Sequence, residues 1–168
     1  KTSKGRAIQN LINLPSDDKV MAYLNVKDLK DQDYLNNHYV IMCTTKGIVK
    51  KTCLEAYSRP RQNGINAIGI REGDSLLEAK LTNGDSDVMI AANSGKAISF
   101  HEPKERSMGR GASGVRGIML SDKDSVVGMI CVNNLESHVL VVSENGYGKR
   151  SDIDSYRVTN RGGKGVKT

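Results

Sequence analysis

Short apolar runs that end in a polar turn with glycine recur along the chain and predict β-hairpins. The runs YVIMC, DVMIAA and HVLVV lead into turns at Gly47, Gly95 and Gly146, and a second extended run follows each turn. Glycine reaches positive φ at little cost, which a tight hairpin turn requires. The three glycines are 48 and 51 residues apart, so the hairpins belong to a repeat.

A second pattern recurs in step with the hairpins. A basic loop containing glycine runs into an alternating apolar strand at Gly64, Gly114 and Gly165, at intervals of 50 and 51 residues. Short polar turns at 71–74 and 121–124 separate that strand from the next one. One unit therefore contains a basic loop, a strand, an acidic turn, a strand, a loop, a strand, the glycine hairpin and a last strand.

Four short strands in about fifty residues are the content of one propeller blade. We therefore predict an all-β fold, a β-propeller with three nearly complete blades and the start of a fourth. The prediction is a single partial propeller domain over residues 1–168, with approximate repeats at 5–63, 64–113 and 114–164, and with residues 165–168 opening the next.

The first repeat is longer than the others. Its polar turn at 15–18 separates two apolar runs, 8–14 and 19–26, which we expect to be strands. Residues 27–37 have apolar positions that form no helical stripe. We therefore expect them to be an inserted loop, which lengthens this repeat to 56 residues between Leu14 and Ile70.

The charge balance favours a polyanionic partner. The chain has 25 Lys and Arg against 19 Asp and Glu, a formal net charge of +6, so nucleic acid is the first partner class and an anionic membrane surface the second. No apolar run approaches the roughly 20 residues that span a bilayer, and the three cysteines form no paired motif. We expect a cytoplasmic protein with no membrane partner. Because it begins without methionine and stops inside a repeat, we expect it to be a piece of a longer protein.

The positive charges concentrate in one phase of the repeat. Residues 46–64, 96–116 and 146–167 carry 5, 5 and 6 basic residues against 1, 2 and 2 acidic ones. With the three basic residues of 1–16, this phase holds 19 of the 25 positive charges. Equivalent positions of successive blades lie at the same height and radius, so these cations should form a belt.

A belt of Lys and Arg with little countercharge suits a curved duplex, because neutralised phosphates release counterions whatever the base sequence. The glycines of the basic loops let backbone N–H groups approach phosphate oxygens. The candidate DNA-binding residues are Lys46, Lys50, Lys51, Arg59, Arg61, Lys96, Lys104, Arg106, Arg110, Arg116, Lys149, Arg150, Arg157, Arg161, Lys164 and Lys167.

Other chemistry finds no support in the residue pattern. GRGASG, residues 109–114, has the letters of a dinucleotide-binding loop, but an extended run follows it instead of the required helix. His38, His101 and His138 are isolated from the cysteines, so no zinc spacing exists. We expect no catalytic residue, no metal site and no cofactor in this chain.

The stretches TKGIVKKT at 45–52, MGRGASGVRGI at 108–118, ENGYGKRSDI at 144–153 and RGGKGV at 161–166 resemble the C-terminal domain of DNA gyrase A. The resemblance covers essentially the whole chain. It implies a six-bladed propeller of the pinwheel type that wraps duplex DNA on its basic rim, as part of an ATP-dependent type II topoisomerase. It also implies that the rest of gyrase A, together with gyrase B, are partners, and that ATP and magnesium are used by other domains.

The family's heptapeptide box, Q-R-R-G-G-K-G, falls by position on Thr159–Gly165. Arg161, Gly162, Gly163, Lys164 and Gly165 match it, whereas Thr159 and Asn160 replace Gln and Arg. The resemblance places the true box in the first blade, so this copy belongs to a later blade.

Two alternatives remain open. The equivalent domain of topoisomerase IV has similar blades and lacks the box. A protein-interaction propeller would use the same basic rim to bind an acidic partner. Both keep the predicted fold and change only the role of the belt.

Overall fold

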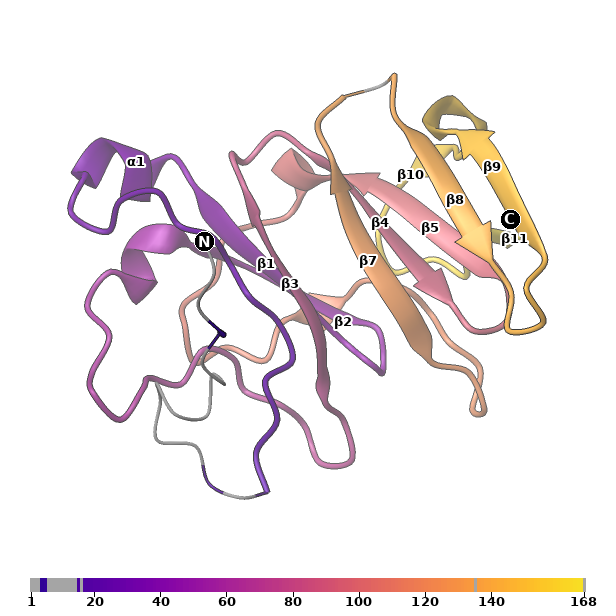
Figure 1. Ribbon diagram of the computed structural model, residues 1–168. Helices are drawn as coiled ribbons and strands as arrows, with labels where there is room; N and C mark the ends of the chain where they lie inside the picture. The colour runs from indigo at the N-terminus through magenta and orange to yellow at the C-terminus, as the bar shows by residue number, and fades with distance from the viewer. Residues whose placement is uncertain (1–3, 6–14, 16, 135, 168) are drawn as a thin grey trace.

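The computed structural model describes residues 4–5, 15, 17–134 and 136–167. Its strands form three sheets that lie side by side (Figure 1). Sheet 1 has the order β3-β1-β2-β6, built from β1 (Tyr39–Thr44), β2 (Ile48–Cys53), β3 (Leu76–Thr82) and β6 (Val115–Arg116). Sheet 2 has the order β10-β5-β4-β7, with β11 also paired to β5; it contains β4 (Asp87–Ala92), β5 (Lys96–His101), β7 (Val126–Val132), β10 (Val158–Thr159) and β11 (Val166–Lys167). Sheet 3 pairs β8 (His138–Val142) with β9 (Gly148–Asp152).

The three predicted hairpins are confirmed. β1 and β2, β4 and β5, and β8 and β9 pair antiparallel. Gly47, Gly95 and Gly146 in the three turns have φ of 79°, 75° and 82°. A short 3₁₀ turn follows the second strand of each hairpin, at η2 (Leu54–Tyr57), η3 (Glu102–Lys104) and η4 (Ile153–Ser155).

Each larger sheet combines strands from successive repeats. In sheet 1 the hairpin β1–β2 lies between β3 of the next repeat and β6 of the repeat after that. In sheet 2 the hairpin β4–β5 lies in the same way between β7 and β11. The predicted three nearly complete blades therefore take the form of one four-stranded, one five-stranded and one two-stranded sheet. The repeat boundaries stay a prediction of the sequence.

The strands expected after the anchor glycines are shorter than predicted. The only paired residues there are β6 after Gly114 and β11 after Gly165, and residues 64–70 contain no strand. After β6 the backbone N–H groups of Gly117 and Ile118 both donate to the Gly47 carbonyl, at 2.8 and 3.3 Å. The chain thus leaves the ladder to cross toward the next sheet.

The first repeat also differs from the prediction. Residues 19–26 form no paired strand, although Ala22, Leu24 and Val26 are half-buried and the residues between them are exposed. Strands at this position, β3 and β7, pair with the hairpin of the preceding repeat, and no described hairpin precedes residue 19. The strand predicted at 8–14 lies outside the described residues.

Residues 27–37 contain a short helix where the sequence predicted a loop. The helix α1 (Gln32–Asn36) is capped by Asp31, whose side chain accepts a hydrogen bond from the Tyr34 amide at 3.1 Å. Its buried residue, Leu35, packs against Val40 and Met42 of β1. A single buried side chain in five residues produces no stripe for sequence analysis to detect.

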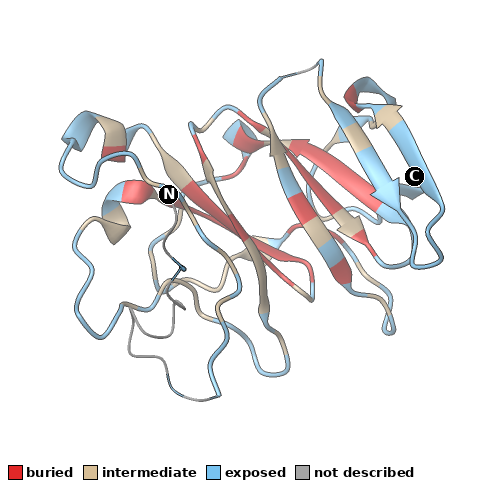
Figure 2. Ribbon diagram, in the orientation of Figure 1, coloured by how far each residue is buried: buried red, intermediate tan, exposed pale blue. Residues whose placement is uncertain are grey.

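The central strands are buried on both faces (Figure 2). Ile41 and Cys43 of β1 pack against sheet 2, whereas Val40 and Met42 pack against α1 and residues 22–26. β4 repeats this alternation between sheets 1 and 3. This explains why both strands read as continuous apolar runs. Each buried aliphatic side chain contributes about 1.5–3 kcal/mol relative to an exposed one, so face-to-face packing of the sheets holds the repeats in sequence.

Position 114 requires glycine for two reasons: its backbone has positive φ, and a side chain there would clash with β2. Its φ is 91°, and a Cβ there would lie 2.5 Å from the carbonyl oxygen of Val49 on β2. Gly165 repeats the contact on β5, where a Cβ would lie 2.8 Å from the Ala97 carbonyl oxygen. The anchor glycines thus let β6 and β11 reach the outer hairpin strands.

Gly114→Ala should lower the free energy of unfolding by about 2–3 kcal/mol, because it adds this clash to the cost of positive φ. Gly64→Ala is the matched control, since Gly64 has φ 77° and no atom within 4 Å of the added Cβ, so it should cost only about 1–2 kcal/mol. Urea denaturation measures both. Equal losses would show that the contact with β2 has no part in stability.

Candidate nucleic-acid interface

Two basic loops of successive repeats lie side by side. We call residues 105–114 the first glycine loop and residues 156–165 the second glycine loop. The Gly162 amide donates to the Gly117 carbonyl at 2.6 Å, and the Arg161 guanidinium donates to the Arg116 carbonyl at 3.4 Å. The Lys104 ammonium reaches the Asn160 side chain at 3.3 Å. Two basic residues of successive repeats, Arg116 and Arg161, therefore lie next to one another.

A further pair of predicted cations meets at the preceding repeat. Arg61 and Arg110 line one recess together with Asn63 and Gly64. Arg110 is half-buried, and its guanidinium donates to the Ala56 carbonyl at 3.3 Å. This hydrogen bond ties the first glycine loop to the 3₁₀ turn η2.

Lys50 is a correction to the predicted interface. Its side chain is fully buried, and its ammonium donates to the carbonyls of Ala67 (2.6 Å) and Arg110. Burial, together with the nearby Arg110 charge, lowers the pKa of Lys50 to about 8. An amine that is enclosed and already hydrogen-bonded offers nothing to a phosphate. It instead holds the first glycine loop in place through its hydrogen bond to the Arg110 carbonyl.

Lys51 is the second correction. It is buried with an ion pair to Glu102, whose Oε1 lies 3.1 Å from the Lys51 Nζ, and the ammonium lies 4.3 Å from the centre of the Tyr39 ring. Glu102 also accepts hydrogen bonds from Thr82 and Ser86. The buried ion pair links Lys51 of β2 to Glu102 of η3. Because its charge is balanced inside the protein, Lys51 is not available to a ligand.

Arg161 stays exposed but is anchored. Its Nε lies 2.5 Å from Oε2 of Glu105, whose side chain is only 2% exposed. Burial raises the pKa of Glu105, while Arg161 and Lys51 act against that rise. The ion pair joins Arg161 of the second glycine loop to Glu105, the first residue of the first glycine loop.

Most of the predicted cations are exposed. The exposed members of the predicted set are Lys46, Arg59, Arg61, Lys96, Lys104, Arg106, Arg116, Lys149, Arg150, Arg157, Arg161, Lys164 and Lys167. Their assignment to DNA stays a prediction.

The predicted cations Lys149 and Arg150 lie on a strand, outside the two glycine loops. Both lie on β9 of the two-stranded sheet 3. Lys149 is the third residue after its hairpin glycine, the position that Lys50 and Ile98 hold in sheets 1 and 2. Those two residues are buried at 0% and 3% exposure, so the exposure of Lys149 follows from the small number of strands in sheet 3.

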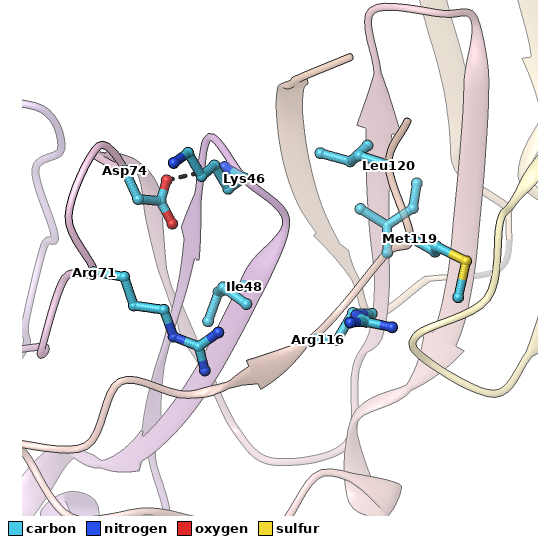
Figure 3. Close-up of a pocket in the computed structure, with 8 residues that line it drawn as sticks. Lys46, Ile48, Arg71, Asp74, Arg116, Met119 and Leu120 are labelled. Atoms are coloured by element: carbon cyan, nitrogen blue, oxygen red, sulfur yellow. Dashed lines mark hydrogen bonds between the residues drawn. The ribbon is translucent and has the colours of Figure 1, made fainter. Parts of the chain in front are cut away.

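A recess between sheets 1 and 2 adds a cation that the sequence did not select. It has a volume of about 630 Å³ and is lined by Lys46, Ile48, Arg71, Asp74, Arg116, Ile118, Met119 and Leu120 (Figure 3). Arg71 belongs to the acid-rich phase of the repeat, so counting charge by phase excluded it. Arg71 could have been predicted from the sequence if the polar turn at 71–74 had been expected to lie next to the tip of the hairpin β1–β2.

The acidic turns hold the hairpin tips. Asp74 Oδ1 accepts hydrogen bonds from the Thr45 hydroxyl at 2.9 Å, the Lys46 amide at 3.0 Å and the Ser75 amide at 2.8 Å. Asp124 makes the equivalent bonds to Ser94 in the next repeat. Burial would raise the pKa of Asp74, but these hydrogen bonds outweigh it and hold the pKa below its usual range.

Neither a membrane-spanning helix nor a metal-binding cluster is present in the described part of the chain. No helix there is long and apolar enough to cross a membrane. No group of three or more His, Cys, Asp or Glu residues there is arranged to hold a metal ion.

Comparison with known proteins places these features in a family. The model of the DNA gyrase C-terminal domain, beta-propeller, matches residues 38–83, 86–133 and 137–168. The A subunit of DNA gyrase from Staphylococcus aureus (strain NCTC 8325 / PS 47) is 41% identical over 169 residues, covering 100% of this chain and 19% of that protein. The same protein from strain MRSA252 is equally similar. The chain therefore spans about a fifth of the length of these relatives.

Solved structures share the fold. A DNA gyrase A C-terminal domain superposes with a TM-score of 0.82 at 27% identity, covering 98% of this chain and 53% of that one. The C-terminal domain of a DNA topoisomerase IV superposes with a TM-score of 0.86 at 24% identity, covering 97% and 49%. The predicted propeller fold is confirmed by the family model and these structures.

Asp74→Ala should lower the free energy of unfolding at pH 7 by about 1–3 kcal/mol, because three donors lose a charged acceptor. The folded pKa is depressed, so this stability is present above the unfolded pKa of about 3.9 and is lost as pH falls below it. The difference between wild type and variant should therefore shrink under acid conditions. Asp122→Ala, in the equivalent turn but exposed, is the control and should change little. Thermal unfolding between pH 3 and 7 measures both, and a difference as large at pH 3 as at pH 7 would contradict the role of the carboxylate.

Proposed function

The chain belongs to the DNA gyrase C-terminal domain family, and from that membership we propose that it binds duplex DNA on the exposed cations of its glycine loops, independently of base sequence. The observation that carries the proposal is the contact of the second glycine loop with the first loop and the residues next to it. Arg161 pairs with Glu105 and donates to the Arg116 carbonyl, and Lys104 reaches Asn160. Cations from separate repeats therefore act as one surface. Phosphate neutralisation by such a surface releases counterions and drives binding.

The interface has the features of a backbone-binding surface. The cations of the glycine loops, β6 and β11 are carried by loops and two-residue strands, and the helix α1 has only five residues. A major-groove reader needs a helix or a two-stranded ribbon directed at base edges. Contacts from loop arginines, lysines and amides would instead be made to phosphates, which position the duplex without reading its sequence.

Buried ion pairs and hydrogen bonds fix the geometry of the loops. Lys50 supports the first glycine loop and Glu105 anchors Arg161 of the second. A fixed row of cations favours one path for the duplex over many. Bending 20–30 base pairs by 40–90° costs roughly 1–6 kcal/mol, and contacts distributed over successive repeats can offset that cost. We propose that the duplex wraps along the repeats in this way.

Within a longer protein, the proposed wrap serves supercoiling by an ATP-dependent type II topoisomerase. The partners would be duplex DNA, the rest of gyrase A and, through it, gyrase B, in the cytoplasm. ATP and magnesium would be used by other domains, and this chain would supply neither a catalytic residue nor a cofactor site.

The equivalent domain of topoisomerase IV is the second candidate. The observation in its favour is the higher TM-score of 0.86 for that structure. Its identity of 24% shows the fold alone, whereas the gyrase A relatives reach 41% over the whole chain. Gyrase is therefore the better supported assignment.

Duplex binding should weaken steeply with salt, because about 0.9 counterions are released per phosphate contact. Lys164→Gln should lower the slope of log K against log salt by about 1 for every duplex sequence tested. Lys27→Gln, an exposed change in the acid-rich phase, is the control and should leave the slope unchanged. Fluorescence anisotropy with two duplexes of unrelated sequence between 50 and 200 mM salt measures this.

Two results would contradict the proposal. One is an affinity that stays constant over this salt range. The other is complete displacement of the duplex by an equal charge concentration of poly-glutamate, which would favour a propeller that binds acidic proteins.

A further inference from the structure

The recess between sheets 1 and 2 brings cations together from three separate elements (Figure 3). Lys46 lies at the tip of the hairpin β1–β2, Arg71 begins the turn before β3, and Arg116 lies on β6. Ile48 and Ile118 line the wall between them. All three cations are exposed, so they are accessible to a ligand.

The recess keeps a net positive charge, because Asp74 offsets only one of its three cations. The carboxylate that lines it belongs to Asp74, and one of its oxygens is occupied by three hydrogen bonds from the hairpin tip and the turn. Lys46 Nζ lies 3.4 Å from the Glu72 carbonyl, a contact that positions the ammonium over the turn without cancelling its charge. Among the residues that the structure describes, Arg71 and Arg116 form no ion pair.

The recess is continuous with the proposed interface. Arg116 lines it, and the Arg116 carbonyl accepts a hydrogen bond from the guanidinium of Arg161 in the second glycine loop. Arg71 therefore extends the cation row from the outer strand β6 to the turn before β3. A duplex strand lying over the glycine loops could continue into the recess.

We propose that this recess is a phosphodiester-binding subsite and that Arg71 is one of its ligands, an inference that rests on the proposed duplex binding. Guanidinium groups bind phosphate oxygens through paired N–H donors, and two of them face the recess from opposite sides. Arg71 thus belongs to the DNA-contacting set, although it lies outside the basic phase of the sequence.

The next boundary between repeats shows what distinguishes this recess. There Lys96, Lys164 and Asp124 line a smaller recess of about 200 Å³, which shares the Met119 and Leu120 wall. Ser121 lies there at the position that Arg71 holds in the first recess. The second recess thus keeps the carboxylate of the turn, with Asp124 in place of Asp74, but has a serine where the first recess has the Arg71 guanidinium.

Arg71→Gln tests the inference, with Lys123→Gln as the matched control. Lys123 is an exposed cation of the equivalent turn and does not line either recess. Arg71→Gln should lower duplex affinity about tenfold at 100 mM salt and reduce the salt slope by about 0.9, the value of one phosphate contact. Lys123→Gln should leave both unchanged. Arg71→Gln combined with Arg116→Gln should reduce the slope by about twice as much.

Arg71→Lys separates charge from packing. It keeps the charge, so the salt slope should stay near that of wild type while affinity falls less than for Arg71→Gln. A slope for Arg71→Lys equal to that for Arg71→Gln would overturn the inference, as would wild-type binding by Arg71→Gln.

The remaining outcomes separate this inference from the proposed function. If Arg116→Gln weakens binding and Arg71→Gln does not, the subsite is wrong and duplex binding stands. If wild type shows no salt-dependent duplex binding, the proposed function itself fails. If Arg71→Gln weakens binding of poly-glutamate but not of the duplex, the recess serves an acidic peptide and the inference is overturned.

Discussion

The structure depends on one packing constraint: the first two glycine hairpins are each enclosed between strands that later repeats supply. β3 and β6 flank the first hairpin, and β7 and β11 flank the second. Gly114 and Gly165 make this possible, because any Cβ at those positions would meet the carbonyl of the outer hairpin strand. A sheet completed by later repeats cannot form from one repeat alone. Successive repeats are therefore locked at a fixed offset, and residues about fifty positions apart become neighbours.

This offset gives the basic residues two different roles. Where the sheet covers them, as at Lys50 and Lys51, they support loops and balance buried carboxylates. Where the loops leave the sheet, they face solvent. Removing one partner of a buried pair leaves an uncompensated charge, which is strongly destabilising. The buried lysines therefore maintain the surface that the exposed cations form, although they do not touch a ligand.

The sequence predicted the features that depend on local chemistry or on the repeat. Gly47 and Gly95 marked the hairpins because positive φ is a local requirement, and the basic phase followed from the spacing of the anchor glycines. The burial of Lys50 could not be predicted, because its two carbonyl partners lie 17 and 60 residues away. Arg71 was missed for the same reason, since its neighbour Arg116 comes from a later repeat. Which repeat supplies each strand of a sheet also depends on long-range pairing, and the periodicity of the sequence does not predict it.

Membership of the gyrase C-terminal domain family and the structure agree on a propeller whose repeats present cations together. The central claim is that the exposed lysines of the basic phase meet DNA and that the lysines of the acid-rich phase do not. Acetylation of individual lysines, quantified by mass spectrometry with and without a saturating duplex, tests it most directly. The account predicts that the duplex protects the exposed lysines of the basic phase between residues 46 and 167, which are Lys46, Lys96, Lys104, Lys149, Lys164 and Lys167. Lys27, Lys30, Lys80 and Lys123 should react equally in both states. Protection spread evenly over both groups would contradict the account.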